Sequence, residues 1–266
     1  MRGRGRILVW IERLGLAAAG IGLIFGLWNL VIVIFGLQPF VLPTPQSAVS
    51  AIVDNWSALG TLTWQTVKET VDGFVLGAVV GFVLAVVMSL FRPVQRLIYP
   101  ALITSQAVPI VAIAAPLVIL LGFGMLPKLI IVAWIVFFPV VVNVLDGLAH
   151  IDDDLIRLAK VMGAHRAREF LQIRLPATLS PLFSGLKIGA TYAVTGAVIG
   201  EWTASSQQGL GTYLLTANSS LDVQAVFGVT LLLTAIGVLS FLFVMGVEAF
   251  ATPWRTRSTS RRRFVP

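Results

Sequence analysis

The chain has 266 residues, of which 57% are hydrophobic and only 12% are charged. A soluble globular domain carries about 25% charged residues, so this composition excludes an ordinary soluble domain and predicts a protein that crosses the membrane several times. The net charge of +7 does not indicate a nucleic-acid-binding face, because the basic residues cluster at the ends of apolar runs, and the absence of cysteine excludes a disulfide framework and a thiolate metal site.

Apolar stretches of membrane-spanning length follow one another along the chain, which predicts an all-α integral membrane fold. After a proline-rich turn, a short helix lying at the outer membrane interface is predicted from Gln46 to Trp56. Six transmembrane helices are expected, at residues 14–37, 70–91, 97–122, 126–145, 182–202 and 223–250.

Glycines repeat four residues apart in the second and fifth predicted spans. Gly73, Gly77 and Gly81 share one helix face, and Gly185 with Gly189 forms a further pair. Small residues at this spacing allow another helix to approach closely, so these positions predict helix packing. Glycine is also simply common in membrane helices, but three in register favour the packing interpretation.

Prolines interrupt the third predicted span at Pro100, Pro109 and Pro116. A proline removes a backbone donor, and the carbonyl group that it frees is tolerated within a membrane only where protein or water satisfies it. This span is therefore predicted to be broken or kinked and to face the protein interior.

The distribution of basic residues predicts which side of the membrane each segment lies on. With six spans and both termini in the cytoplasm, only Lys68 and Lys128 lie outside, which leaves 17 of the 19 basic residues inside. This topology predicts a basic cytoplasmic N-terminus (1–13), one transmembrane domain (14–254) and a basic cytoplasmic tail (255–266).

One polar stretch, Asp152–Pro176, interrupts the apolar middle of the chain on the predicted cytoplasmic side. Its three leading aspartates suit a helix start, and Gly163 suits a helix end. A second short amphipathic helix is predicted to follow and to be closed by Pro176. Two such helices with a corner at Gly163-Ala164 would fit a groove on a soluble partner. Residues 150–176 are called the coupling segment below.

The coupling segment resembles a cytoplasmic motif of the membrane subunits of ATP-binding-cassette (ABC) importers, written E-A-A, three residues, G, nine residues, I-x-L-P. The spacing from Ala159 through Gly163 to Ile173 and Leu175-Pro176 fits without a gap. The chain departs from the motif at Arg157 and Leu158, where the family has Glu and Ala. Outside this segment, the chain is similar to the permeases for nitrate, sulfonate, taurine and thiamin-pyrimidine precursors. The similar stretches are Leu42-Pro43-Thr44-Pro45, Ala115-Pro116-Leu117, Gly122-Phe123-Gly124, Gly200-Glu201-Trp202 and Gly209-Leu210-Gly211.

The resemblance implies a homodimer in the prokaryotic inner membrane, two ATPase subunits docked at the coupling segment, and an external solute-binding protein. ATP and Mg would be bound by the partner ATPase, because this chain has no G-x-x-x-x-G-K-[ST] phosphate loop. No cofactor or metal is expected in this chain. The expected docking residues are Asp154, Arg157, Leu158, Ala159, Met162, Gly163, Ala164, His165, Phe170, Ile173, Leu175 and Pro176, and the expected translocation-path residues are Glu69, Thr104, Pro109, Thr195 and Glu201.

Three other interpretations of the polar residues were weighed. The aspartates 152–154 are consecutive and no second acidic cluster exists, which argues against an intramembrane, magnesium-dependent enzyme. His150 and His165 are far apart and are interpreted as solvated loop residues rather than metal ligands. An ion-coupled secondary transporter is the more serious alternative, but no carboxylate–base pair is evident at mid-depth in the spans.

Glu201 carries two open alternatives. It follows the Gly196–Gly200 pair at the outer end of the fifth predicted span, where a carboxylate would line a translocation path. It would equally suit an interfacial carboxylate held by Trp202 and by loop amides. In the first case, Glu201→Gln would lower transport while the complex still assembled.

Overall fold

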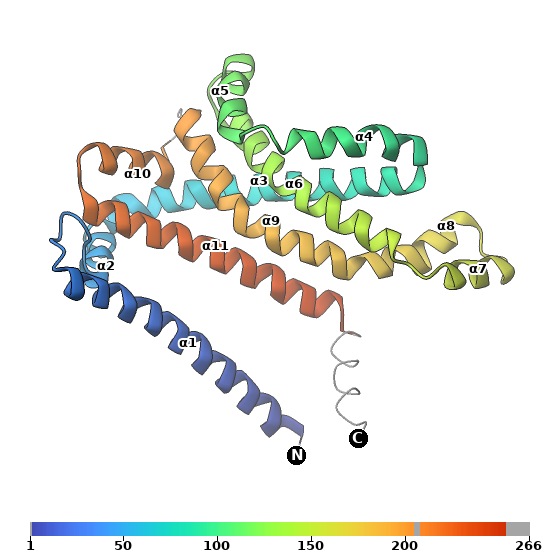
Figure 1. The fold of residues 1–266 in the computed structure, drawn as a ribbon, viewed down its shortest axis with the longest axis horizontal. Coiled ribbons are helices and arrows are strands. Elements are labelled where there is room, and N and C mark those ends of the chain that lie inside the picture. The colour runs from blue at the N-terminus through green and yellow to red at the C-terminus, as the bar shows by residue number, and fades with distance from the viewer. Residues whose placement is uncertain (1, 205–207, 254–266) are drawn as a thin grey trace. The chain divides into compact units, whose positions relative to one another are not determined.

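The fold is that of a computed structural model, which describes residues 2–204 and 208–253. Every regular element in this described part is a helix (Figure 1), which agrees with the predicted fold class. The predicted tail at 255–266 lies outside the described residues. The elements are α1 (Arg2–Phe35), α2 (Pro45–Asp54), α3 (Trp56–Leu90), α4 (Arg92–Ser105), α5 (Ile110–Leu121), α6 (Met125–Ala149), α7 (Asp153–Val161), α8 (Arg166–Glu169), the π-helix η1 (Phe170–Arg174), α9 (Leu175–Thr203), α10 (Leu210–Ser219) and α11 (Val223–Ala251).

Within the described residues, four helices are long and apolar enough to cross a membrane: α3, α6, the continuous helix Phe170–Thr203, and α11. A fifth crossing results if α4 and α5 together form one span. The apolar stretch of α1 found in the described residues, Ala19–Phe35, is shorter than these candidate spans. The structure thus contains four or five candidate spans.

The chain divides into two compact units. The first comprises the chain up to Gly60 together with Leu214–Leu231. In it, the side chain of Thr44 accepts a hydrogen bond from the Ser47 amide and caps α2, so the short helix predicted after the proline-rich turn is present. Trp28 donates from Nε1 to the Pro43 carbonyl (3.1 Å) and packs against the ring of Phe227, with ring centroids 5.4 Å apart.

The second unit, Thr61–Tyr213 with the chain from Leu232 onward, is organised around α6. The valines of α6 at positions 132, 136, 140, 141 and 144 are fully buried. Gly77 of α3 lies against this helix so closely that an added Cβ would come 2.6 Å from the Ala133 carbonyl oxygen. Gly73 and Gly81 lie one turn to either side and face Val132 and Phe137. The glycine face predicted on the second span is therefore the face that α3 presents to α6.

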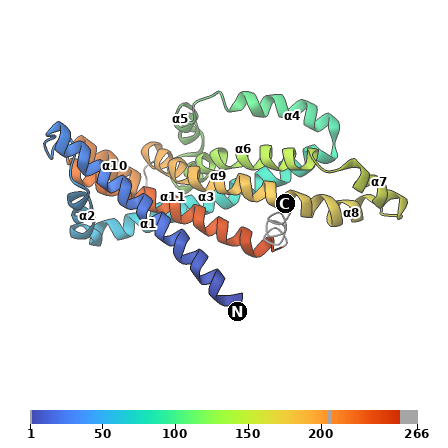
Figure 2. The same cartoon turned by 60° about the horizontal axis from the view of Figure 1, so that its bottom comes forward.

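Helix α9 contacts α6 along its length, and the two helices lie side by side in both views (Figures 1 and 2). Gly185 of α9 lies at Pro139, where an added Cβ would come 2.7 Å from the carbonyl oxygen, and Gly189 faces Val136. At the two ends of the pair, Gly200 of α9 meets Lys128 and Pro181 of α9 meets Gly147. The α6–α9 pair is thus packed backbone to backbone from one end to the other.

The third predicted span is broken, as its prolines indicate. Helices α4 and α5 are separated by residues 106–109 and meet at an angle of 102°. Pro109 is the N-cap residue of α5, where the missing backbone N–H leaves no hydrogen bond unmade. Leu102 of α4 belongs to the same main apolar core as Met88 of α3, so α4 lies against the C-terminal half of α3.

Candidate functional site

The coupling segment lies at one end of the α6–α9 pair, where α7 and α8 connect the two helices (Figures 1 and 2). Helix α6 ends at Ala149, and the helix that becomes α9 begins at Arg166. Both ends of the segment therefore continue directly into the two most closely packed helices of the unit.

Local signals in the sequence produce both ends of α7. The side chain of Asp152 accepts a hydrogen bond from the Asp154 amide at 2.9 Å and caps the start. Gly163 has a φ of +81°, which favours glycine, and its amide donates to the Lys160 carbonyl. The Ala164 amide donates to the Ala159 carbonyl, so the pair of bonds forms a Schellman motif. The predicted corner at Gly163-Ala164 is therefore present.

The coupling segment presents large apolar side chains to its surroundings. Leu158 is 56% exposed and Met162 is 78% exposed, and Leu155 and Val161 are exposed with them. A small cavity of about 280 Å³ between α7 and the following helix is lined by Leu155, Leu158, Met162 and Ile173 among others. Contiguous exposed apolar surface outside the membrane spans is typical of a protein–protein interface.

The second predicted helix of the segment differs from the expectation. The helix does not close at Pro176 but continues from Phe170 to Thr203 without a break. Pro176 lies in the first turn of α9, where the lack of a backbone donor is tolerated, and the preceding turn is the wider π-helix η1. The expectation that Pro176 closes the second short helix was therefore wrong, and the predicted fifth span, 182–202, lies within a longer helix.

The remaining expected docking residues fall into two groups. Asp154 and Arg157 are exposed and form an ion pair at 3.7 Å, and His165 is also exposed. Pro176 is exposed as well. The others are partly buried, namely Ala159, Ala164, Phe170, Ile173 and Leu175. The motif residues thus lie on two helices, α7 and the helix that becomes α9, on either side of the corner at Gly163.

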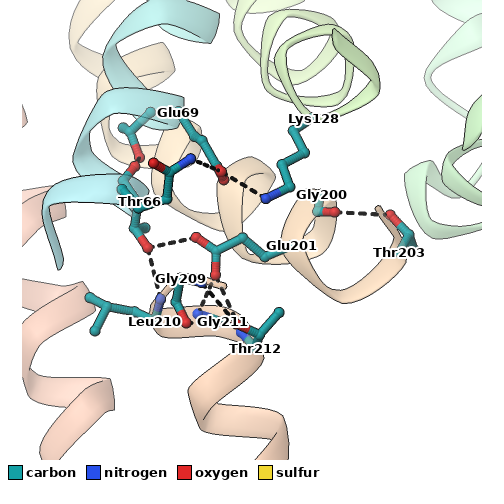
Figure 3. A network of polar contacts seen from close by, with 12 residues as sticks. Thr66, Glu69, Lys128, Gly200, Glu201, Thr203, Gly209, Leu210, Gly211 and Thr212 are labelled. Carbon is teal, nitrogen blue, oxygen red and sulfur yellow. Dashed lines mark hydrogen bonds and ion pairs between the residues drawn. The ribbon is translucent and has the colours of Figure 1, made fainter. Parts of the chain in front are cut away.

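At the opposite end of the α6–α9 pair, Glu201 lies in a fully buried polar network (Figure 3). Its carboxylate accepts hydrogen bonds from the Thr66 hydroxyl (2.6 Å) and from the amides of Gly211 and Thr212. The indole of Trp202 donates to the Gly211 carbonyl at 2.8 Å. The Glu201 carboxylate is therefore held by amides of the first turn of α10, to which Trp202 also bonds. A role of Glu201 in the translocation path stays a prediction.

Two ion pairs connect the candidate spans. Lys128 of α6 and Glu69 of α3 are both fully buried and lie 2.8 Å apart, while Oε2 of Glu69 has no hydrogen-bond partner. Lys187 of α9 and Glu248 of α11 lie 2.7 Å apart. The sequence analysis identifies neither pair, and all four residues lie near the ends of the predicted spans rather than at their middle. The sequence conceals these pairs because their members are about sixty positions apart.

The other three expected translocation-path residues are exposed. Thr104 and Pro109 flank the break between α4 and α5, and the Thr104 hydroxyl donates to the Pro100 carbonyl. Thr195 lies one turn before Ile199 on the same face of α9, and Ile199 packs against Ala114 of α5. These residues are therefore grouped around α5, separate from the buried Glu69 and Glu201.

The histidines do not form a metal site in the described part of the chain, where no group of three or more His, Cys, Asp or Glu residues could hold a metal ion. His150 is exposed and its Nδ1 lies 3.3 Å from the Asp146 carboxylate.

We expect Glu201→Gln to lower the free energy of unfolding by about 1–3 kcal/mol, since an amide offers one acceptor oxygen where the carboxylate uses two. Thermal unfolding of the purified protein measures the loss. Asp72→Asn, an exposed carboxylate on the same helix as Thr66, is the matched control and should leave the transition unchanged. An unchanged transition for Glu201→Gln as well would contradict the structural role.

Comparison with known proteins agrees with this arrangement. Residues 73–255 match the family described as the binding-protein-dependent transport system inner membrane component. The chain is 33% identical to a probable ABC transporter permease protein of Haemophilus influenzae, over 82% of this chain and 89% of the relative. It is 31% identical to the formylaminopyrimidine transport permease protein ThiX of Halalkalibacterium halodurans, over 83% and 88%. It is 28% identical to the riboflavin transport system permease protein RibX of Chloroflexus aurantiacus, over 85% of each chain.

The family match covers the second half of α3 and all of α6, the coupling segment, α9 and α11, which are the elements that carry the packing and the exposed apolar surface described above. The long apolar helices are those of a multi-pass protein of the cytoplasmic membrane. The chain belongs to the family of binding-protein-dependent transport system inner membrane components, the permease subunits of ABC importers.

Proposed function

We propose that this chain is the permease subunit of an importer that moves a small heterocyclic solute inward, driven by a separate ATPase that docks on the coupling segment. The observation that carries the proposal is the exposed apolar surface of α7 at the end of the α6–α9 pair. A soluble partner that covered Leu158 and Met162 would remove this surface from water and would hold both helices by their shared end.

The proposed topology has six spans with both termini in the cytoplasm. It treats α1 as the first span and the bent pair α4–α5 as the third. Its support is the distribution of basic residues, since 17 of 19 then lie on the side of the coupling segment. Lys128, one of the two exceptions, is fully buried, so its charge does not lie in an outer loop.

The proposed assembly contains two copies of this chain, two ATPase subunits and an external solute-binding protein. The partner ATPase would bind ATP and Mg, because the chain itself lacks a phosphate loop. The exposed apolar face of α5, with Ile119 83% exposed and Leu120 79% exposed, offers a surface for the second copy. The path for the solute would then run between the copies, beside Thr104, Pro109 and Thr195.

A thiamin-pyrimidine precursor or a related heterocycle is the proposed solute. Two relatives are named for heterocycles, formylaminopyrimidine and riboflavin, and their matches cover more than four fifths of this chain. Sulfonate, taurine or nitrate is the alternative within the same group of permeases. Calorimetric titration of the cognate solute-binding protein with a formylaminopyrimidine and with taurine would distinguish these classes.

Gly163→Arg tests the docking proposal. Arginine at a φ of +81° is strained, and its side chain would project from the corner of the segment, so we expect loss of ATPase co-purification from membranes. Gly36→Arg is the matched control, because Gly36 also has a positive φ and open space around it but lies at the end of α1.

ATPase recovered at wild-type yield with Gly163→Arg would contradict docking at this corner. No ATPase recovered with the wild-type chain would contradict the proposed function and would favour an ion-coupled transporter, for which the buried Glu69–Lys128 pair would be a candidate coupling site.

A further inference from the structure

The helix that leaves the coupling segment changes its width before it becomes α9. Residues Phe170–Arg174 form a π-helix, and the Leu175 amide donates to the Phe170 carbonyl five residues earlier. Such wide turns inside α-helices are rare and are concentrated at functional sites. This turn lies between the exposed surface of α7 and the closely packed part of α9.

Pro176 gives a physical cause for the wide turn. In an α-helix its ring would clash with the carbonyl of Gln172, four residues earlier, and it has no N–H to donate to that carbonyl. A wider turn moves the carbonyl away from the ring while the helix continues. The wide turn is therefore encoded locally, immediately after the coupling segment's last turn.

An ion pair closes the same turn. Both Nη2 and Nε of Arg174 contact Oε1 of Glu169, at 2.8 and 2.9 Å. In an α-helix, residues five positions apart point about 140° away from each other, so this pair depends on the wider turn. The Glu169 side chain is only 7% exposed and that of Arg174 is 26% exposed, so water screens the pair less than a surface pair.

A cavity of about 550 Å³ lies beside the pair. It is lined by Glu169, Phe170 and Arg174 on one side, by Ser89–Phe91 at the end of α3, and by Lys160 of α7. The side chains of the π-turn therefore have space to move on this side, whereas α9 beyond it is held against α6 by Gly185. The turn therefore lies between a part of the chain beside a cavity and a part packed closely on α6.

We infer that Glu169 and Arg174 are positioning residues, which stiffen the π-turn so that movement of the coupling segment is transmitted to α9. This inference rests on the proposed function, because it requires an ATPase that moves the segment. With the pair intact, the segment and α9 turn together. Without it, the segment moves while the π-turn absorbs the motion.

The test uses the full complex of permease, ATPase and binding protein, with ATP and vanadate as the probe. Because the chain has no cysteine, Tyr192→Cys creates a single site for a fluorescent label on the exposed face of α9. The measured quantity is the change in label emission when ATP and vanadate are added. In the otherwise wild-type chain we expect a clear shift.

Glu169→Gln and Arg174→Gln are each expected to abolish the shift at position 192 while the ATPase still co-purifies. The charge-exchanged double variant, Glu169→Arg with Arg174→Glu, restores the pair and is expected to restore the shift. If Glu169→Gln fails to fold, Arg174→Gln still tests the inference, because Arg174 is the more exposed partner of the pair. Asp146→Asn is the matched control, since it removes an exposed carboxylate that contacts His150 at the other connection of the segment, and it should leave the shift unchanged.

A full shift in both single variants would overturn the inference. Loss of ATPase co-purification in folded Glu169→Gln would also overturn it, because the pair would then serve docking rather than transmission. Failure of the proposed function is a separate result, namely that the wild-type chain binds no ATPase and shows no shift.

Discussion

Lys128→Met is expected to lower the free energy of unfolding by about 3–5 kcal/mol. The methionine fills a similar volume but leaves the Glu69 carboxylate buried without its ionic partner, and Oε2 of that carboxylate already lacks a hydrogen-bond partner. Burying an unpaired charge costs much more than losing an exposed one. Denaturant or thermal unfolding of the purified protein measures the loss.

Two variants make the Lys128 prediction specific. Lys68→Met removes an exposed ammonium group next to Glu69 on α3 and should change stability little. The double variant Lys128→Met with Glu69→Gln removes both charges, and it should recover a large part of the loss. A double variant as unstable as the sum of the two single variants would show that the pair is not the source of the effect.

Gly77→Leu is expected to prevent α3 from packing on α6. Even a single Cβ at this position would lie 2.6 Å from the Ala133 carbonyl oxygen and 2.9 Å from the Ala133 Cα, and backbone atoms cannot turn aside as a side chain can. Gly77→Ala should already cost about 1–3 kcal/mol, and leucine should leave little folded protein. The yield of monodisperse protein after detergent extraction measures this.

The control for Gly77 is another glycine in a long apolar helix. Gly246 of α11 has no neighbouring atom within 4 Å of an added Cβ, so Gly246→Leu should be extracted at the wild-type yield. Equal yields for the two leucine variants would contradict the close approach of α3 and α6.

The features that could be predicted from the sequence are those that depend on neighbouring positions. The spacing of Gly73, Gly77 and Gly81 indicated a packing face, and the structure places that face on α6. The prolines indicated a break in the third span, and Gly163 indicated the end of α7. In each case the cause lies within a few residues, through sterics or a local hydrogen bond.

The features that the sequence does not predict are of two kinds. Some depend on contacts between distant positions, and others on a local pattern that fits more than one backbone conformation. The sequence predicts Lys128 only as a residue of the outer side, because nothing near it in the sequence shows that Glu69 will approach it. Pro176 was interpreted as a helix end, but the π-turn before it lets the helix continue. The sequence predicts a loop after Glu201, yet Leu210–Ser219 form helix α10, whose first turn contains Gly211.

Cross-linking from the coupling segment tests the central claim most directly. Leu158→Cys introduces a single thiol on the exposed surface of α7, in a chain that has no other cysteine. After treatment of membranes with a photoactivated thiol-specific cross-linker, the predicted result is an adduct between position 158 and an ATP-binding subunit. Phe243→Cys on α11, exposed within a span, is the control and should give no such adduct. The contradictory result is an ATPase adduct at position 243 or at neither position, because the coupling segment would then not be the surface on which the ATPase docks.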